Sequence, residues 1–250
     1  MSVTAELPTL LRSLRLPTIG DVWQSLLTQA EDEHWSHAHY LSVLCELEAN
    51  ARETKRIARF TREAALPLSK TMSSFDFYAE MLPYKARIEA LSSTCEWVDR
   101  SDNLLIFGPS GVGKTHLAAA IGHSLIQLGV RVRHFSSVAL VQMLQQARNE
   151  LRLEDTLHKL DKYAVIILDD IGYVRKNEAE THVLFELISY RYESGSMIVT
   201  SNQPFSGWEG IFPDSSMTVA AIDRLVHHST ILDIQAQSFR KRFAELHNKQ

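Results

Sequence analysis

A glycine-rich octapeptide near the middle of the chain carries the clearest chemical signal. It reads Gly108, Pro109, Ser110, Gly111, Val112, Gly113, Lys114, Thr115 and fits the phosphate-binding loop pattern of nucleotide-binding proteins. Backbone N–H groups of such a loop surround phosphates, and the helix that follows directs its positive end at them. We expect Lys114 to reach the β- and γ-phosphates of a nucleotide and the Thr115 hydroxyl to bind Mg²⁺. A chance match would occur in roughly one chain in a hundred of this length.

A second motif places two acids at the end of an apolar run. Asp169 and Asp170 follow Val165–Leu168, and such a run is typical of a strand buried on both faces of a parallel sheet. We expect Asp169 to hold Mg²⁺ through water and Asp170 to orient or deprotonate the attacking water. The alternative is two ordinary acids at a strand end. Small-molecule kinases also have a phosphate-binding loop, so these two motifs alone do not identify the reaction.

Three later side chains bear on hydrolysis. Asn202 is the last residue of the polar triplet that ends the strand expected from Met197, and it can share the attacking water with Asp170. Arg224, expected just past a helix, could reach the γ-phosphate of a neighbouring subunit, and Arg240 could touch the same phosphate within its own chain. Arginine there stabilises the charge that develops in the transition state. The ordinary alternative for Asn202 is a cap at the end of a strand. For each arginine it is a surface charge, and this alternative is favoured when either arginine is considered alone.

The elements that must hold these residues alternate between strand and helix from Asn103 onward. We expect strands at 104–107, 130–135, 164–168, 197–201 and 231–234, with helices at 114–127, 138–149 and 182–192. This alternation predicts an α/β fold, a doubly wound parallel sheet with crossover helices.

The first hundred residues show helical spacing and no strand-like alternation. Apolar residues within 41–47 recur at helical intervals. Pro67 ends this region, because proline disfavours helix in the residue before it. A linker over 68–76 and a further helix over 84–98 follow. We therefore expect a small all-helical N-terminal domain over residues 1–66 and a nucleotide-binding domain over 67–250.

Composition and charge describe an ordinary globular chain of 250 residues. Hydrophobic residues make up 45% and charged residues 22%, and the net charge is −4, so DNA contact requires a local basic patch. The two cysteines, Cys45 and Cys95, match no metal or redox spacing, which suits a reducing cytosol. The first twelve residues lack an apolar core flanked by basic residues, so we expect no signal peptide. No apolar run approaches the roughly 20 residues of a membrane helix. We expect a cytoplasmic protein without a membrane segment.

One basic stripe stands out in the helical region. Its members fall at i, i+3, i+4, i+7 and i+10, on one helix face: Arg52, Lys55, Arg56, Arg59 and Arg62. Such a stripe can neutralise phosphates along a duplex. A solvated face, or one paired with acids elsewhere, is an equally good interpretation of the charge pattern alone.

Two smaller groups invite a functional interpretation. Phe75 and Phe77 precede the sheet and could pack on adenine, but core packing is favoured for any single phenylalanine. His34, His37 and His39 look like a metal cluster, yet they lie in a polar helix and lack a second ligand group. We expect these histidines to be surface residues.

Taken in order, the motifs resemble the AAA+ ATPases of the DnaA/DnaC group, and most nearly the IstB-type helper ATPases of bacterial insertion sequences. The resembling segments are residues 70–77, 108–117, 168–172, 187–192, 200–205 and 223–228. Together they span essentially residues 70–242. Residues 1–65 fit the helical N-terminal domain of that family in length and character more than in motif.

The resemblance implies an AAA+ P-loop NTPase that uses ATP and Mg²⁺. Because 16 residues follow Ile234, we expect the lid to be reduced to a short C-terminal helix. The resemblance implies the roles of sensor 1 for Asn202, arginine finger for Arg224 and sensor 2 for Arg240. It also implies ATP-dependent self-assembly on double-stranded DNA, which favours DNA for the basic stripe, and stimulation of a partner transposase. One departure is Asp170, where such proteins more often carry glutamate, and its shorter side chain could slow hydrolysis.

Three other functions remain open. The nearest is a replicative helicase loader of the DnaC/DnaI type, which shares the ATPase core. A small-molecule kinase is disfavoured by Asn202 and Arg224 and by the lack of an evident acceptor site. The third is a scaffold protein that binds a nucleotide without hydrolysing it.

Overall fold

The computed structural model describes residues 3–172, 177–210 and 215–239. The chain divides into two compact units, Met1–Arg59 and Phe60–Gln250. The division falls inside helix α3 (His37–Ala64). A domain boundary after residue 66, which the sequence favours, stays a prediction.

The N-terminal unit is built from α1 (Val3–Ser13), α2 (Pro17–Asp32) and most of α3, as the helical spacing predicted. Its core is the apolar cluster of Leu11, Ile19, Trp23 and Leu44. A buried acid fixes the start of α2, because the Glu48 carboxylate accepts the backbone N–H groups of Thr18 and Ile19 at 2.8 and 3.2 Å. These are donors that the first turn of a helix leaves unpaired. The three histidines of the polar region, His34, His37 and His39, are exposed as expected.

The larger unit contains a five-stranded sheet in the order β2-β3-β4-β1-β5, with every neighbouring pair parallel. Its strands are β1 (Asn103–Phe107), β2 (Val132–Ser136), β3 (Val165–Asp169), β4 (Ser196–Ser201) and β5 (Ser229–Asp233). Each lies within two residues of its predicted position. The doubly wound parallel sheet expected from the alternation of elements is confirmed.

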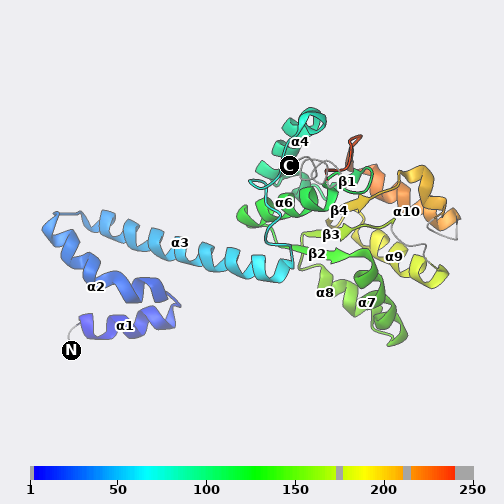
Figure 1. Ribbon diagram of the computed structural model, residues 1–250. Coiled ribbons are helices and arrows are strands. Elements are labelled where there is room, and N and C mark those ends of the chain that lie inside the picture. Colours follow the sequence, from blue (N-terminus) through cyan, green and yellow to red (C-terminus); the bar gives the residue numbers. More distant parts are fainter. Residues whose placement is uncertain (1–2, 173–176, 211–214, 240–250) are drawn as a thin grey trace. The chain divides into compact units, whose positions relative to one another are not determined.

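Helices cover both faces of this sheet (Figure 1). Helix α6 (Lys114–Gln127) lies on one face with α4 (Leu82–Ser93) packed on it, and α7 (Ser137–Asn149), α8 (Leu153–Leu160), α9 (Glu178–Arg191) and α10 (Ser215–His227) form the other layer. Alternate strand residues serve the two layers: Ile166 and Leu168 join the α7–α9–α10 cluster, whereas a Cβ on Gly122 of α6 would lie 2.9 Å from Ile167. None of the helices in the described ranges combines the length and apolar character of a membrane span.

The single helix expected over 84–98 is wrong. Helix α4 ends at Ser93, and α5 (Glu96–Asp99) follows after a break. Thr94 takes an extended conformation there, with φ −133° and ψ 158°. The buried indole of Trp97 donates to the Leu91 carbonyl at 3.0 Å, which ties the short helix back to α4 and closes the turn.

Three further differences lie on the side of α7 to α10. Helix α8 was not predicted. Helix α9 begins at Glu178 rather than at residue 182, because Asn177 and Glu180 form a reciprocal capping box at its start. Arg224 lies in the last turn of α10, not past a helix. The short C-terminal helix expected as a reduced lid lies outside the described residues.

Candidate functional site

The glycine-rich loop joins β1 to α6 and needs its glycines for backbone reasons. Gly108 has φ +146°, and a Cβ there would lie 2.6 Å from the carbonyl oxygen of Ile234. Gly113 has φ +100° directly before α6, with the Phe75 ring 3.2 Å from where its Cβ would be. At both positions the φ angle and the close neighbour disfavour a residue with a Cβ, whereas glycine adopts these φ angles readily. The loop therefore presents its backbone at the N-terminal end of α6, where the helix dipole attracts anions.

Lys114 is held inside this loop. Its side chain is buried at 8% exposure, and Nζ donates to the carbonyls of Gly108 and Pro109 at 2.8 and 2.9 Å. A buried ammonium requires such partners. The charge therefore lies at the centre of the loop, beside the carbonyls of Gly108 and Pro109.

Asp169 ends β3 and accepts two hydroxyl groups on Oδ1, from Thr115 at 3.0 Å and from Thr200 at 2.6 Å. His134 lies on the neighbouring strand with Nε2 3.8 Å from Oδ2, too far for a hydrogen bond but close enough to act through charge. Burial raises the pKa of Asp169, but His134 and the two hydroxyl groups outweigh that effect, and the pKa lies below its ordinary value. The carboxylate is therefore ionised at neutral pH and faces the Thr115 hydroxyl.

Asp170 adopts a strained backbone conformation next to Asp169. Its φ is +65°, in the left-handed region that aspartate tolerates better than most residues. Two hydrogen bonds hold it there: its N–H donates to the Thr200 hydroxyl at 2.8 Å, and its carbonyl accepts the Ser137 hydroxyl at 2.9 Å. Strain of this kind persists only where the surroundings fix it, and it concentrates at functional sites.

Asn202 follows β4, one strand away from the acids. Its side-chain oxygen is buried, and within the described part of the chain no donor reaches it. A buried acceptor without a partner costs free energy. Asn202 lies on a cavity wall together with Asp170. A proton of a water or a ligand in the cavity would therefore supply the hydrogen bond that its oxygen lacks.

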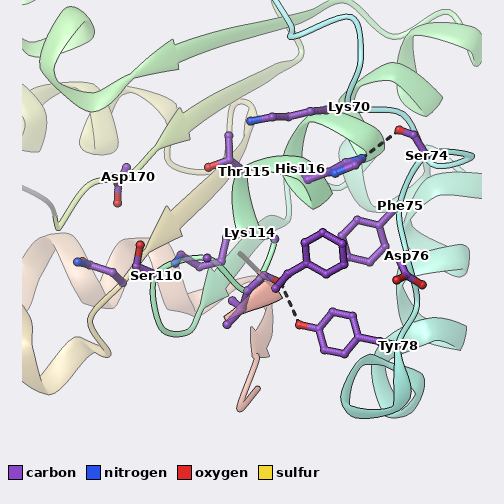
Figure 2. A pocket seen from close by; sticks show the side chains of 15 residues that line it. Lys70, Ser74, Phe75, Asp76, Tyr78, Ser110, Lys114, Thr115, His116 and Asp170 are labelled. Carbon is purple, nitrogen blue, oxygen red and sulfur yellow. Dashed lines mark hydrogen bonds between the residues drawn. The ribbon is translucent and has the colours of Figure 1, made fainter. Parts of the chain in front are cut away.

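These residues surround one cavity of about 430 Å³ (Figure 2). Its walls are formed by the loop from Ser110 to Thr115 and by Lys70, Ser74, Phe75, Asp76, Tyr78, His116, Asp170, Asn202 and Phe239. The structure thus brings together the phosphate loop, the second acid and the asparagine that the sequence singled out separately. Asp169 lies behind the wall and is connected to it through Thr115.

The segment before the sheet and the first turn of α6 add cavity residues to which sequence reasoning gave no role. His116 Nε2 lies 3.2 Å from the Ser74 hydroxyl and 3.1 Å from the Thr71 carbonyl. Tyr78 donates to the Val112 carbonyl at 3.4 Å and stacks on Phe239, with ring centroids 6.3 Å apart. The feature of the sequence that could have indicated these cavity residues is the close spacing of the aromatic residues at 75, 77 and 78.

Phe75 packs in the core and also lines the cavity, while its contact with adenine stays a prediction. The ring is buried, packs edge-on against Phe77 and His116 with centroids 4.9 and 5.2 Å apart, and lies behind Gly113. It also lines the cavity. Core packing, the favoured expectation, is confirmed.

Arg224 lies away from the cavity of its own chain. Its guanidinium stacks over the Phe185 ring, 5.1 Å from the ring centroid, and donates to the Ala220 carbonyl at 3.1 Å. It is absent from the cavity wall. Arg240 lies outside the described residues, although the neighbouring Phe239 donates its amide to the Gly111 carbonyl at 3.0 Å.

The basic stripe is exposed along α3, but two of its five members are paired with acids. Arg52 bonds Glu48 at 2.8 Å and also donates to the Arg15 carbonyl. Arg56 bonds Glu53 at 2.7 Å. These pairs fit the solvated-face interpretation for Arg52 and Arg56 and leave the DNA interpretation to depend chiefly on Lys55 and Arg62.

Comparison with known proteins finds sequence similarity along nearly the whole chain. Residues 9–246 match the family described as IstB-like ATP binding protein. A Sinorhizobium fredii protein named as an insertion-sequence ATP-binding protein is 49% identical over 96% of this chain and 80% of its own length. A Pseudomonas aeruginosa protein named as an ATP-binding protein of insertion sequence IS21 is 37% identical over 94% of this chain and 88% of its own length.

Similarity to solved structures concerns the fold. The DnaC helicase loader aligns with a TM-score of 0.57 at 21% identity, over 67% of this chain and 98% of that chain. DnaI aligns with a TM-score of 0.58 at 20% identity, over 69% of this chain and 96% of that chain. These neighbours share the parallel α/β fold of the larger unit.

Proposed function

Because this chain belongs to the family of IstB-like ATP binding proteins, we propose that it hydrolyses ATP with Mg²⁺ and uses the hydrolysis cycle to assist a transposase on DNA. ATP binding and the AAA+ fold follow from the family and from the sheet. The proposal adds hydrolysis of ATP, the use of Mg²⁺, self-assembly, binding to DNA and action on a transposase. Its supporting observation is the single cavity that joins the phosphate loop, Asp170 and Asn202.

The residues beside that cavity fit Mg²⁺. Thr115 Oγ1 and Asp169 Oδ1 are hard oxygen ligands that lie 3.0 Å apart. The Thr115 hydroxyl donates its proton to Asp169, so its oxygen lone pairs remain available to a metal ion. Thr115 would therefore bind Mg²⁺ directly, and the Asp169 carboxylate would hold the ion through its hydration shell. The ion would neutralise charge on the phosphates that Lys114 contacts.

The other residues divide the work of attack on the γ-phosphate. Asp170 orients or deprotonates the attacking water, and the buried Asn202 oxygen accepts a second hydrogen bond from it. Arg224 is absent from its own cavity, so we assign it to a neighbouring subunit's γ-phosphate. Arg240 is assigned to the phosphate in cis.

The names of the relatives support the transposition role. Each is called an ATP-binding protein of an insertion sequence, and an element that moves requires a transposase and DNA. We assign duplex contact to the stripe on α3, chiefly through its members without a described acidic partner, Lys55 and Arg62. The protein would act in the cytoplasm, where the DNA is.

A helicase loader is the second candidate, favoured by the fold similarity to DnaC and DnaI. The test is to assay ATP turnover and DNA binding with duplex and single-stranded DNA, with an insertion-sequence transposase and with a hexameric helicase. The helper function predicts tighter binding to duplex and a transposase whose strand-transfer rate rises with ATP. Preference for single strands together with capture of the helicase would replace it with the loader. No turnover under any of these conditions would leave a nucleotide-binding scaffold.

A further inference from the structure

A second cluster of chemically active side chains lies at the edge of the sheet opposite the nucleotide cavity. Glu193 lies in the turn that leads from α9 into β4, and His227 and His228 lie where α10 leads into β5. The phosphate loop instead follows the carboxyl end of β1. Because β1 pairs in parallel with both β4 and β5, the two sites are separated by the length of the strands.

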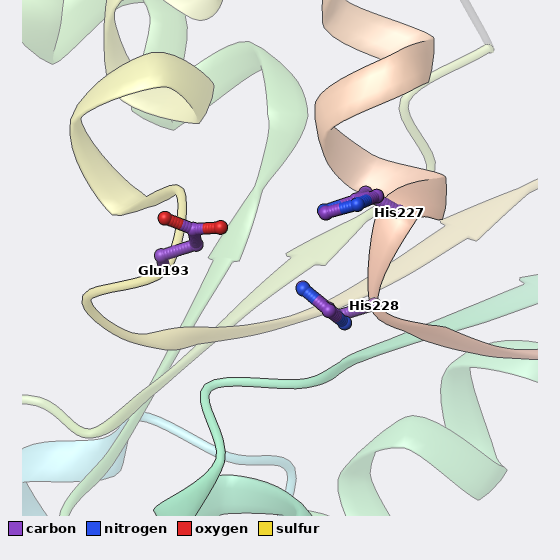
Figure 3. Close-up of side chains that lie close together, drawn as sticks. All are labelled: Glu193, His227 and His228. Carbon is purple, nitrogen blue, oxygen red and sulfur yellow. The ribbon is translucent and has the colours of Figure 1, made fainter.

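The three side chains converge. One ligand atom from each of Glu193, His227 and His228 lies within 4.8 Å of the other two, and the imidazole centroids are 4.1 Å apart. Figure 3 shows the carboxylate and both rings turned toward one another from the two turns. Across the described ranges, no other set of three His, Cys, Asp or Glu side chains meets this condition.

The backbone under each ligand is anchored. Glu193 takes φ +56° after α9, and the following N–H groups of Ser194 and Gly195 both donate to the Arg191 carbonyl at 3.1 Å. On the other side, the His228 carbonyl accepts the Asn103 N–H at 2.7 Å, at the start of β1. The ligands therefore extend from two fixed turns, and only exposed side chains must move to change their separation.

A tyrosine fixes one of the rings. The Tyr192 hydroxyl bonds His227 Nδ1 at 2.8 Å, which leaves Nε2 as the nitrogen open to a ligand. A metal-bound histidine keeps its proton on the other ring nitrogen and donates it to an oxygen that orients the ring. The tyrosine oxygen is placed to accept that proton from Nδ1.

We propose that Glu193, His227 and His228 form a binding site for a divalent transition-metal ion such as Zn²⁺, with a fourth position open to water. Two imidazoles and one carboxylate are a ligand set that Zn²⁺ uses. Tetrahedral ligands lie roughly 3.3 Å apart at Zn–N distances of about 2.0–2.1 Å, so the side chains need only close by rotation. The bound ion would cross-link the end of α9 to the end of α10.

The test is calorimetric titration of the full chain with Zn²⁺, without nucleotide or Mg²⁺. The unmodified protein is expected to show a tight site of unit stoichiometry, weakened at least tenfold by His228→Ala and by Glu193→Gln. Tyr192→Phe keeps all three ligands and is expected to weaken binding by roughly 10–100-fold, the usual effect of losing a residue that orients a ligand. His182→Ala is the matched control, because His182 is also accessible and lies 3.9 Å from an acid, Glu178, but belongs to no cluster of three.

Thermal unfolding gives a second measurement. With free Zn²⁺ at about a hundred times its Kd, the Tm is expected to rise by roughly 5–10 °C in the unmodified protein and in His182→Ala, and by much less in His228→Ala. Unchanged ATP affinity in each variant shows that the fold is intact. Equal Zn²⁺ affinity in the unmodified protein and in a His227→Ala/His228→Ala double variant would overturn the site, as would an equal loss in the His182 control.

Discussion

Replacing Thr200 with valine tests whether one hydroxyl holds both acids of the nucleotide site. Thr200 is 1% exposed. Its oxygen donates to Asp169 at 2.6 Å and accepts the Asp170 N–H at 2.8 Å. Valine has nearly the same shape and suits a strand equally well, so the change removes the two hydrogen bonds and little else.

The expected cost follows from these two bonds. A hydrogen bond to a charged group contributes about 1.5–3 kcal/mol, and a backbone N–H left without a partner costs about 1–3 kcal/mol when buried. The Asp170 amide is only partly buried, so we take the lower end of its range and expect a loss of roughly 2–4 kcal/mol. For a unit of this size that corresponds to a fall in Tm of roughly 4–16 °C.

Thr230→Val on β5 is the matched control, because that hydroxyl accepts only a long 3.4 Å contact from Arg87 among the described bonds. Calorimetric melts of the two variants and the unmodified protein compare them directly. A Tm for Thr200→Val within about 2 °C of the control would refute the argument that this hydroxyl fixes the acids.

The same variant has a pH signature. The folded-state pKa of Asp169 is lowered, so Asp169 stabilises the fold above its ordinary pKa of about 3.9, and that contribution is lost as pH falls through the lowered value. Losing the Thr200 bond raises the folded pKa and reduces the contribution. The stability difference between the two proteins should therefore narrow as pH falls from 7 to below about 4. A difference that widens in acid would contradict the assignment of the shift to Thr200.

Four further predictions concern function. Lys114→Ala should abolish tight ATP binding, since it removes the charge at the centre of the loop, and retained affinity in a calorimetric titration would refute that role. Asp170→Asn should bind ATP and lose at least 100-fold in turnover, and surviving hydrolysis would move the water-orienting role elsewhere. Arg224→Ala should bind ATP normally but not hydrolyse it, and mixing it with Lys114→Ala should restore part of the activity if the arginine acts in trans. Absence of recovery at every mixing ratio would count against that arrangement. Changing Lys55 and Arg62 to glutamate should flatten the salt dependence of duplex binding by about one unit of slope per lost phosphate contact, whereas an unchanged slope in fluorescence anisotropy would remove the stripe from the DNA surface.

The nucleotide loop and its strands were predictable because local rules determine them. The glycines at 108 and 113 have positive φ angles that glycine accepts readily. Apolar runs marked the buried strands because a parallel sheet is covered on both faces. The motifs therefore located Lys114, Asp170 and Asn202 on one cavity wall before any contact was known.

What could not be predicted depends on contacts between residues distant in sequence. Phe239 reaches the cavity by bonding the loop at Gly111 and stacking on Tyr78, and no periodicity reports such pairing. The break before α5 depends on where the Trp97 indole finds its acceptor. Arg52 likewise pairs with Glu48, the buried acid that caps α2. A charge pattern alone cannot distinguish an arginine paired in this way from one on a free basic face.

The position of Arg224 can be weighed against its proposed role in a neighbouring subunit. Its present contacts are a stacking interaction with Phe185 and one bond to a helix carbonyl, worth about 0.5–1 and about 1 kcal/mol. An arginine finger accelerates phosphoryl transfer by about 10³–10⁵, equivalent to roughly 4–7 kcal/mol of transition-state stabilisation. Stabilisation of the transition state at a partner's γ-phosphate would therefore exceed the free energy lost with both contacts, whereas a monomer lacks an equivalent anion and keeps the stacked arrangement. Phe185→Ala should accordingly change turnover by the assembly far less than Arg224→Ala does, and equal losses in the two variants would mean that the stack itself sets the catalytic position.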